Sequence, residues 1–354
     1  MTATVITLYD RAALSAIVPQ WEELAANALE PNPFYEPWIL LPALRARREG
    51  ELCCASVWDG GRLIGLFPFE RRREFKRLPV ATLSSWRHSA YLLCTPLLRR
   101  DSVGPALRAL LRWAVDEASV LEFLYVPAEG PFDDALRECA RTLVRTARFT
   151  RPLLVKGASA DAYMEEALSA RLRRQLRRNQ RRLAERGAST FAIGPGGVIG
   201  DQVERFIELE ASSIANRIFG REVLKAAHRR GRLQLVGIDC EGRAIARRCS
   251  LLAGEGAYAF KTAYDEDYAA YSPGVLAEAL SLCEFHALPR VKWMDSHTEP
   301  GDSTLNRMWR HRRSMQSIAV ATGGWGALWL SVYSSLRPVV KDTARIAERA
   351  RPSA

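Results

Sequence analysis

The same order of predicted strands and helices occurs twice along the chain, and this repetition constrains the fold more than any other feature. Each stretch contains two strands joined by a tight turn, at Asp59-Gly60-Gly61 and at Cys240-Glu241-Gly242, followed by a strand, a helix and a further strand. Strands that alternate with helices indicate an α/β unit. We therefore expect two tandem halves, and 354 residues exceed what a single hydrophobic core usually serves.

Hydrophobic periodicity and turn residues place the individual elements. In the first half we expect strands at residues 52–58, 62–67, 91–95 and 120–125 and a helix at 103–117. In the second half we expect helices at 170–186, 202–215, 274–286 and 304–312 and strands at 233–239, 243–252, 257–264, 291–295 and 314–322. The predicted fold class is α/β (α+β), in which each half is a mixed, mostly antiparallel sheet flanked by helices. The predicted domains are residues 1–155 and 156–323.

Residues 324–354 form a separate amphipathic and basic tail. Its first part is apolar at positions such as Trp325, Leu328 and Trp329, and its second part is rich in arginine. We expect a helical tail that Pro338 interrupts, because proline lacks the N–H that a helix interior needs. The apolar part is too short to span a bilayer, so docking on the domain, on a partner or on a membrane surface are the alternatives.

Positive charge is concentrated in one predicted helix. The chain has 51 basic and 40 acidic residues, a net charge of +11, and residues 171–187 alone contain eight arginines and one glutamate. Ser169 is the expected N-cap of this helix. Leu172, Leu176 and Leu183 lie on one stripe, which Asn179 interrupts. The arginines fit three uses: a solvated surface, a groove for a phosphate-bearing substrate, or a patch for nucleic acid or a membrane.

The cysteines and the hydrophobic segments indicate the cellular environment of the protein and whether it holds a metal. The seven cysteines include no C-x-x-C pair and no cluster with zinc spacing, so we expect reduced thiols and no metal cofactor. The N-terminus has no signal-peptide pattern, and no segment offers about 18 apolar residues for a membrane span. We expect a cytoplasmic protein, and the sequence leaves its oligomeric state open.

The segment from Tyr264 to Leu276 joins a predicted strand to a predicted helix and contains Ser272-Pro273-Gly274. A helix N-terminus presents unpaired N–H groups and a positive dipole, and glycine lets a ligand approach the backbone closely. Such a turn can hold a pyrophosphate. The same residues equally fit a purely structural start, with Ser272 as cap and Pro273 at the first helical position.

Three blocks resemble the acyl-CoA transferase half of the GNAT superfamily: the arginine-rich run ending in Leu183-Ala184-Glu185-Arg186-Gly187, the Tyr264–Leu276 segment, and Trp293-Met294-Asp295-Ser296 followed by Asn306-Arg307-Met308-Trp309. They cover about residues 155–322. The resemblance is to the CelD-like branch found with bacterial cellulose and exopolysaccharide synthesis, which is related to FemA/FemX-type aminoacyltransferases. It implies a GNAT-like fold for each half, with the first half degenerate.

The resemblance implies roles for particular residues. A donor thioester would lie between two splayed strands and its pyrophosphate at the following helix start, where the implied cofactor-binding residues are Tyr268, Ser272, Pro273, Gly274 and Val275. The candidate catalytic residues are Asp295 as general base, His297 as its rival, and Tyr264 as a donor to the leaving thiolate. The alternatives are a loop-anchoring carboxylate for Asp295, a solvated loop histidine for His297 and a packing residue for Tyr264. The candidate substrate-binding residues are Arg174, Arg178, Asn306, Arg307, Trp309 and Arg313.

One motif departs from the family pattern. Many relatives carry Gly-Asp-x-x-Tyr-Lys before the tryptophan, whereas this chain has Gly301-Asp302-Ser303-Thr304-Leu305-Asn306. The lysine is therefore missing, and Arg307, Arg312 or Arg313 could supply its charge.

The predicted function is transfer of an acyl group from acyl-CoA to an amino group of a sugar, lipid or peptide in cell-envelope or polysaccharide synthesis. The expected partner is a small-molecule or envelope-precursor acceptor, and the tail offers a peripheral membrane contact. The alternatives are a non-catalytic protein that binds phosphate or nucleic acid on the same fold, and a FemX-like transferase that takes its donor from aminoacyl-tRNA.

Overall fold

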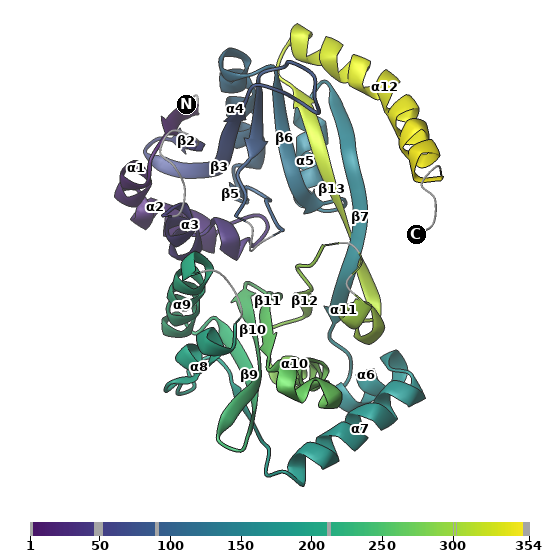
Figure 1. Ribbon diagram of the computed structural model, residues 1–354. Coiled ribbons are helices and arrows are strands. Elements are labelled where there is room, and N and C mark those ends of the chain that lie inside the picture. The colour runs from purple at the N-terminus through teal and green to yellow at the C-terminus, as the bar shows by residue number, and fades with distance from the viewer. Residues whose placement is uncertain are drawn as a thin grey trace.

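One continuous mixed sheet runs through the whole molecule (Figure 1). The computed structural model describes residues 3–45, 52–88, 92–210, 214–299, 301 and 303–349. Within these residues the strand order is β1-β2-β3-β4-β6-β13-β7-β12-β11-β10-β9-β8, with β5 beside β3. The strands are β1 (Thr4–Leu8), β2 (Leu52–Asp59), β3 (Arg62–Arg72), β4 (Thr82–Ser85), β5 (Leu97–Leu98), β6 (Val120–Pro127), β7 (Leu143–Val155), β8 (Ser189–Ile193), β9 (Leu233–Cys240), β10 (Arg243–Ala253), β11 (Gly256–Tyr264), β12 (Trp293–Asp295) and β13 (His311–Ala321).

Counted inward from each edge of the sheet, the strands pair in the same pattern in both halves, which confirms the predicted tandem halves. In the first half, β1 to β4 are antiparallel neighbours and β4 then pairs in parallel with β6. In the second half, β8 to β11 are antiparallel neighbours and β11 pairs in parallel with β12. The two similar turns of the sequence, at Gly60-Gly61 and Glu241-Gly242, join β2 to β3 and β9 to β10, at equivalent places of the two halves.

The last strand of each half lies in the sheet of the other half. β13 ends the second half in sequence but pairs with β6, and β7 ends the first half but pairs with β12. The two strands also pair with each other, from His311 opposite Leu153 to Val320 opposite Leu143. Ile318 and Val320 of β13 therefore complete the core of the first half, and Leu154 of β7 belongs to a core of the second half.

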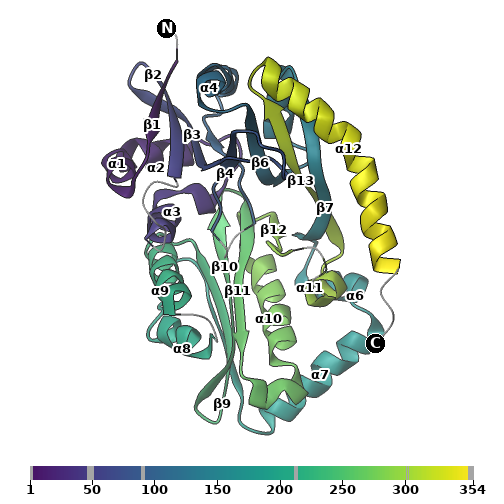
Figure 2. The same ribbon diagram turned by 45° about the horizontal axis from the view of Figure 1, so that its top comes forward.

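Helices cover the sheet (Figure 2). They are α1 (Arg11–Ala16), α2 (Val18–Ala26), α3 (Pro37–Leu44), α4 (Val103–Glu117), α5 (Pro131–Cys139), α6 (Ala160–Ala167), α7 (Ala170–Ala184), α8 (Gln202–Leu209), α9 (Ile214–Arg229), α10 (Pro273–Ala287), α11 (Ser303–Met308) and α12 (Gly324–Arg349). α3 lies against α9 of the other half. One hydrophobic core therefore spans both halves and includes Trp21 and Phe34 together with Phe206 and Leu224.

One expected strand of the first half is wrong. Residues 92–96 form no regular element, β5 follows at Leu97–Leu98, and Tyr91 lies outside the described residues. Leu92, Leu93 and Cys94 are nonetheless almost fully buried. The apolar run thus reflects burial of an irregular segment, which periodicity alone does not distinguish from a strand.

The arginine-rich helix α7 begins as predicted. The Ser169 hydroxyl accepts the N–H of Leu172 at 3.2 Å and caps the helix. Asn179, which interrupts the leucine stripe, is buried, and its side-chain amide donates to the Tyr271 carbonyl at 2.8 Å. The polar residue in the apolar stripe thus holds α7 against the segment that precedes α10.

The C-terminal tail is one helix, and the expected interruption at Pro338 is wrong. α12 runs from Gly324 to Arg349, because the loss of a single backbone hydrogen bond does not force a helix to end. Its first turns pack on the first half, where Leu330 is fully buried beside Phe75 and Val120. Among the described residues, no helix combines the length and apolar character needed to cross a bilayer.

Candidate active site

A pocket of about 490 Å³ lies in the wedge between β11 and β12. The two strands pair only from Gly256 to Tyr258 and from Trp293 to Asp295. Beyond Tyr258, β11 continues to Tyr264, while the chain after Asp295 lines the opposite wall of the pocket. The lining residues are Arg248, Ala259, Phe260, Lys261, Thr262, Tyr264, Ala269, Ser272, Pro273, Gly274, Val275, Glu278, Ser296, His297, Thr298, Thr304 and Leu305.

The N-terminus of α10 forms one wall of this pocket. Ser272 has left-handed backbone geometry, with φ of 52°, and its side chain makes no capping hydrogen bond. The side-chain cap of the structural alternative is therefore absent. Pro273 has no N–H and the Val275 N–H donates to the Ser272 carbonyl at 3.0 Å, so the Gly274 N–H is the first-turn group that a side-chain cap would have satisfied. A Cβ added at Gly274 would lie 3.1 Å from the Tyr264 ring, so this position is tightly packed without a side chain. Such a helix start suits an anion.

Four of the five predicted cofactor-binding residues line the pocket, namely Ser272, Pro273, Gly274 and Val275. Tyr268 does not. Its side chain is buried, its hydroxyl donates to Glu241 at 3.1 Å, and the Arg186 guanidinium lies 5.4 Å from its ring centroid. The structure thus places Tyr268 in the packing between α7 and the hairpin of β9 and β10.

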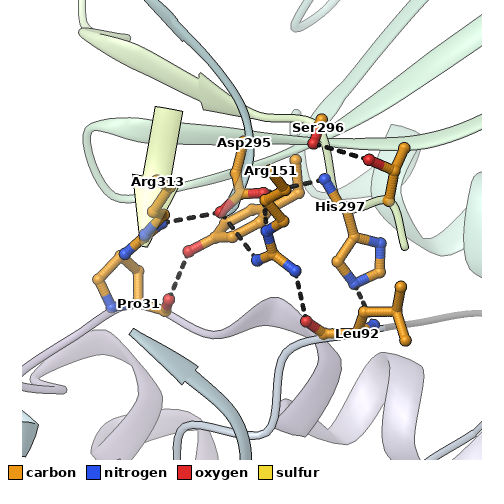
Figure 3. A network of polar contacts seen from close by, with 9 residues as sticks. Pro31, Leu92, Arg151, Asp295, Ser296, His297 and Arg313 are labelled. Carbon is orange, nitrogen blue, oxygen red and sulfur yellow. Dashed lines mark hydrogen bonds and ion pairs between the residues drawn. The ribbon is translucent and has the colours of Figure 1, made fainter. Parts of the chain in front are cut away.

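Asp295 lies behind the pocket in a buried network of ions (Figure 3). Its carboxylate is fully buried and meets Arg151 in two contacts, at 2.6 Å to Nε and 2.8 Å to Nη2, and accepts a bond from Arg313 Nη1 at 3.0 Å. It also accepts the backbone N–H of His297 at 2.9 Å. Burial alone would raise the pKa of Asp295, but the charges of Arg151 and Arg313 hold it below the ordinary value. These surroundings favour the alternative of a loop-anchoring carboxylate, and the role of general base stays a prediction.

His297 is buried rather than solvated, which corrects one alternative from the sequence. It is 7% exposed, its ring stacks on Phe34 at 4.2 Å, and its Nε2 accepts the N–H of Leu92 at 2.6 Å. Burial, helped by the charge of Arg151, lowers the pKa of His297 to about 3. The imidazole is therefore neutral at neutral pH, and because Nε2 is an acceptor its proton lies on Nδ1. His297 lines the pocket, but its Nε2 is already engaged.

Tyr264 is the most accessible of the three candidate catalytic residues. Its side chain is 42% exposed and lines the pocket beside Gly274. The structure therefore brings together Tyr264 and His297 at the pocket and places Asp295 one layer below them.

None of the six predicted substrate-binding residues lines this pocket. Arg174 and Arg178 are exposed on α7. Trp309 is buried and its indole donates to Glu278 at 2.8 Å, while Arg313 contacts Asp295 and lies over the Trp293 ring.

The segment around α11 is held by the buried side chains of Leu305, Met308 and Trp309 and by bonds from Arg312 to its backbone. Asn306 is half-buried, and its carbonyl accepts a bond from Arg312 at 3.0 Å; Arg307 is exposed on the same helix. Arg312 also donates to the Trp309 carbonyl at 2.6 Å. Arg312 therefore satisfies carbonyls at the end of α11, and its role in place of the family lysine stays a prediction. Asp302 lies outside the described residues.

Sequence reasoning missed two features of the site. Arg248 and Glu278 form a buried ion pair in the pocket wall, and Glu278 also holds Trp309. The first half contributes Arg151 on β7 and Leu92, whose carbonyl accepts a bond from Arg151 at 2.6 Å. Glu278 lies in a helix that also contains Glu284 and His286, so the sequence did not single it out, and nothing local to Leu92 or Arg151 indicated their role.

The equivalent wedge of the first half also borders a pocket, of about 580 Å³, whose lining includes Arg87, Glu122 and Tyr125. Glu122 on β6 occupies the position that corresponds to Asp295, because Ser84 pairs with Glu122 as Tyr258 pairs with Asp295. The buried residues Trp86, Leu93 and Cys94 lie beyond this pair, and the Cys94 N–H donates to the Tyr125 carbonyl at 3.3 Å. The two halves thus share a backbone plan, but in the first half the chain at Trp86, Leu93 and Cys94 takes up part of the corresponding space.

Comparisons with solved structures support this architecture. FemX aligns with a TM-score of 0.55 and 8% identity, covering 88% of this chain and 96% of FemX. A conserved protein of unknown function from Bacteroides thetaiotaomicron has the same TM-score, at 12% identity, with coverages of 86% and 97%. The C-terminal domain of a putative lysylphosphatidylglycerol synthetase from Agrobacterium fabrum aligns with a TM-score of 0.51 and 11% identity, covering 91% and 96%. At these identities the likeness shows the fold alone.

A sequence family match identifies the half that carries the pocket. The acetyltransferase (GNAT) domain family matches residues 170–298, from the start of α7 to the loop after β12. A comparison with curated protein sequences found no match. The described residues contain no group of three or more His, Cys, Asp or Glu side chains placed to hold a metal ion. Residues 170–298 thus match the acetyltransferase (GNAT) domain family, and the two-half fold around them is similar to that of FemX.

Proposed function

We propose that the pocket between β11 and β12 binds an acyl-CoA and that the protein transfers its acyl group to an amine. The observation that carries this proposal is the open wedge with the uncapped N-terminus of α10 at its wall. In this binding mode the pyrophosphate lies at Gly274, where N–H groups and the helix dipole favour negative charge. The thioester lies along the edge of β11 beyond Tyr258, where pairing with β12 has ended.

The residues around the wedge fit such a ligand. Ala259, Val275 and Leu305 provide apolar contacts for a pantetheine or acyl chain. The cations of the wall are already neutralised, since Arg248 pairs with Glu278 and Lys261 with Glu210. The Gly274 N–H and the dipole of α10, rather than free cations, are therefore the proposed phosphate contacts.

Direct transfer requires proton movement at two places. The attacking amine loses a proton, and the thiolate that leaves gains one, which a positioned acid assists. Tyr264 is the proposed donor because its side chain is exposed at the pocket, and the proton that the amine releases restores its hydroxyl, so that one proton in total moves from the amine to the thiolate. Asp295 and His297 are proposed as positioning residues, which hold the loop after β12 through Arg151 and Leu92.

We further propose that the acceptor is the amino group of a sugar, lipid or peptide in envelope or polysaccharide synthesis. This part rests on the resemblance to the CelD-like branch. The division into residues 1–155, 156–323 and 324–354 is likewise a proposal, in which the second half carries the chemistry.

Calorimetric titration with acetyl-CoA and with palmitoyl-CoA tests the donor site. Gly274→Glu places a carboxylate at the proposed pyrophosphate position, so we expect binding to weaken at least tenfold. Gly104→Glu is the matched control, because Gly104 is the second residue of α4, the equivalent helix of the first half, and an added Cβ there meets only the flexible end of Arg108.

Loss of binding in Gly274→Glu alone, with thermal unfolding unchanged in both variants, would support the site. Equal binding by both variants would place the donor elsewhere. Failure of the unmodified protein to bind either thioester would exclude acyl-CoA and direct the search to an aminoacyl-tRNA donor.

A further inference from the structure

A second pocket of about 630 Å³ lies on the other side of α10, between α6, α7 and α10. We call it the α7 groove. Its floor is apolar and consists of Met164, Leu168, Leu176, Leu183, Leu276, Ala279 and Leu280. Its volume lies within the range of about 300–1,000 Å³ that is usual for ligand pockets.

The α7 groove is separate from the proposed donor site. Leu276, Ala279 and Cys283 of α10 face the groove, whereas Gly274 and Glu278 of the same helix face the wedge. A ligand of the α7 groove is therefore a different molecule from the acyl donor.

Arginines of α7 line one rim of the groove. Arg173 and Arg177 both belong to the lining, and within the described residues neither guanidinium group makes an ion pair or hydrogen bond. α7 itself has seven arginines and no acidic residue. The opposite rim, on α6, carries Asp161 and Glu165. An apolar floor beside unpaired cations is complementary to a molecule with an acyl chain and an anionic head group.

We propose that the α7 groove binds an anionic phospholipid, with an acyl chain on the apolar floor and the phosphate at Arg173 and Arg177. The remaining exposed arginines, such as Arg174 and Arg178, then face the anionic surface of a bilayer. The carboxylates of Asp161 and Glu165 lie on the other rim and favour a head-group position on the α7 side.

The groove favours a lipid over a nucleic acid. A polyanion such as RNA would engage the arginine face without occupying an apolar floor, and α7 offers no aromatic side chain on which a base could stack. Binding of RNA in place of phospholipid is one of the outcomes that the test distinguishes.

The test combines vesicle sedimentation with cysteine labelling of the full chain. The protein is mixed with vesicles of phosphatidylcholine alone or phosphatidylcholine with phosphatidylglycerol, and separately with a single-stranded RNA or inorganic phosphate. Cys283 lines the groove and is partly exposed, so its alkylation, followed by peptide mass spectrometry, reports occupancy. Cys139 on α5 is also partly exposed but lies in the first half, and is the internal reference.

We expect sedimentation with phosphatidylglycerol vesicles and protection of Cys283, without protection of Cys139. The double variant Arg173→Gln/Arg177→Gln should bind these vesicles at least about tenfold more weakly than Arg174→Gln/Arg178→Gln. A tenfold loss corresponds to about one hydrogen bond to a charged group. Both variants remove two charges, so the comparison cancels the loss of net charge.

Three results would overturn the proposal. Equal weakening by the two double variants would show that only the charge of α7 matters. Vesicle binding without protection of Cys283 would show that no chain enters the groove. Protection by RNA or phosphate, with no binding to phosphatidylglycerol, would assign the arginines to another anion.

Discussion

At the scale of single residues, the centre of the molecule is a set of charges shared by both halves. Asp295 of the second half accepts bonds from Arg151 and Arg313, and Arg151 in turn donates to the backbone of Leu92. Leu92 also holds His297 at the pocket. The geometry of the pocket loop therefore depends on residues that lie far apart in the sequence.

Replacement of Asp295 tests whether it positions the loop. Asp295→Asn keeps the shape of the side chain but leaves two arginines near a neutral group, so we expect a loss of about 3 kcal/mol in the free energy of unfolding. Urea unfolding measures it. Unchanged stability, together with abolished turnover, would instead favour the role of general base.

His297 predicts a dependence of stability on pH. Its pKa is about 3 in the folded protein and about 6.5 when unfolded, so between these values the unfolded chain binds a proton that the folded chain does not. The free energy of unfolding should therefore fall by about 1.4 kcal/mol for each unit that the pH decreases from 6.5 towards 3. His297→Gln, which keeps an acceptor for the Leu92 N–H, should reduce this slope in urea titrations at several pH values. An unchanged slope would mean that other groups cause it.

At the scale of elements, local sequence patterns predicted most of the helices and strands of the second half. The three strands β9, β10 and β11 and the helices α7 and α10 lie where their periodicity and turn residues indicated. The failures have physical reasons. The buried segment at 92–96 resembles a strand in composition, and α12 continues through Pro338. Arg173 and Arg177 rather than Arg174 and Arg178 line a pocket, since sequence alone does not say which side of an arginine-rich helix faces its neighbours.

In the candidate site, too, the residues that are contiguous in sequence were predictable and those brought together by distant strand pairing were not. Ser272, Pro273, Gly274 and Val275 were predictable because a strand, a turn and a helix start are contiguous in sequence. The network around Asp295 was not, because pairing of β7 with β12 brings Arg151 to it across 144 residues. Periodicity carries no information on such pairings.

At the scale of the whole molecule, the exchange of β7 and β13 makes each half depend on the other. Without β13 the first half loses Ile318 and Val320 from its core, and the edge of β6 is unpaired. Without β7 the second half loses Leu154 and Arg151. The two halves are thus one folding unit, although each has its own backbone plan.

Separate expression of the halves tests this dependence. Residues 1–155 alone should fail to give a monomer with cooperative unfolding, whereas co-expression with residues 156–354 should yield a one-to-one complex. Size exclusion and circular dichroism provide the measurement. A stable monomer of residues 1–155 would show that β7 can take the place of β13 beside β6.

The position of β13 at the end of the chain also affects how the protein is made. β6 leaves the ribosome early, but its partner is synthesised nearly two hundred residues later, on the order of ten to forty seconds at usual rates of translation. During that interval an open strand edge and an unfilled core are exposed to other nascent chains and to chaperones. The yield of this protein in a cell should therefore depend on the speed of translation across its second half.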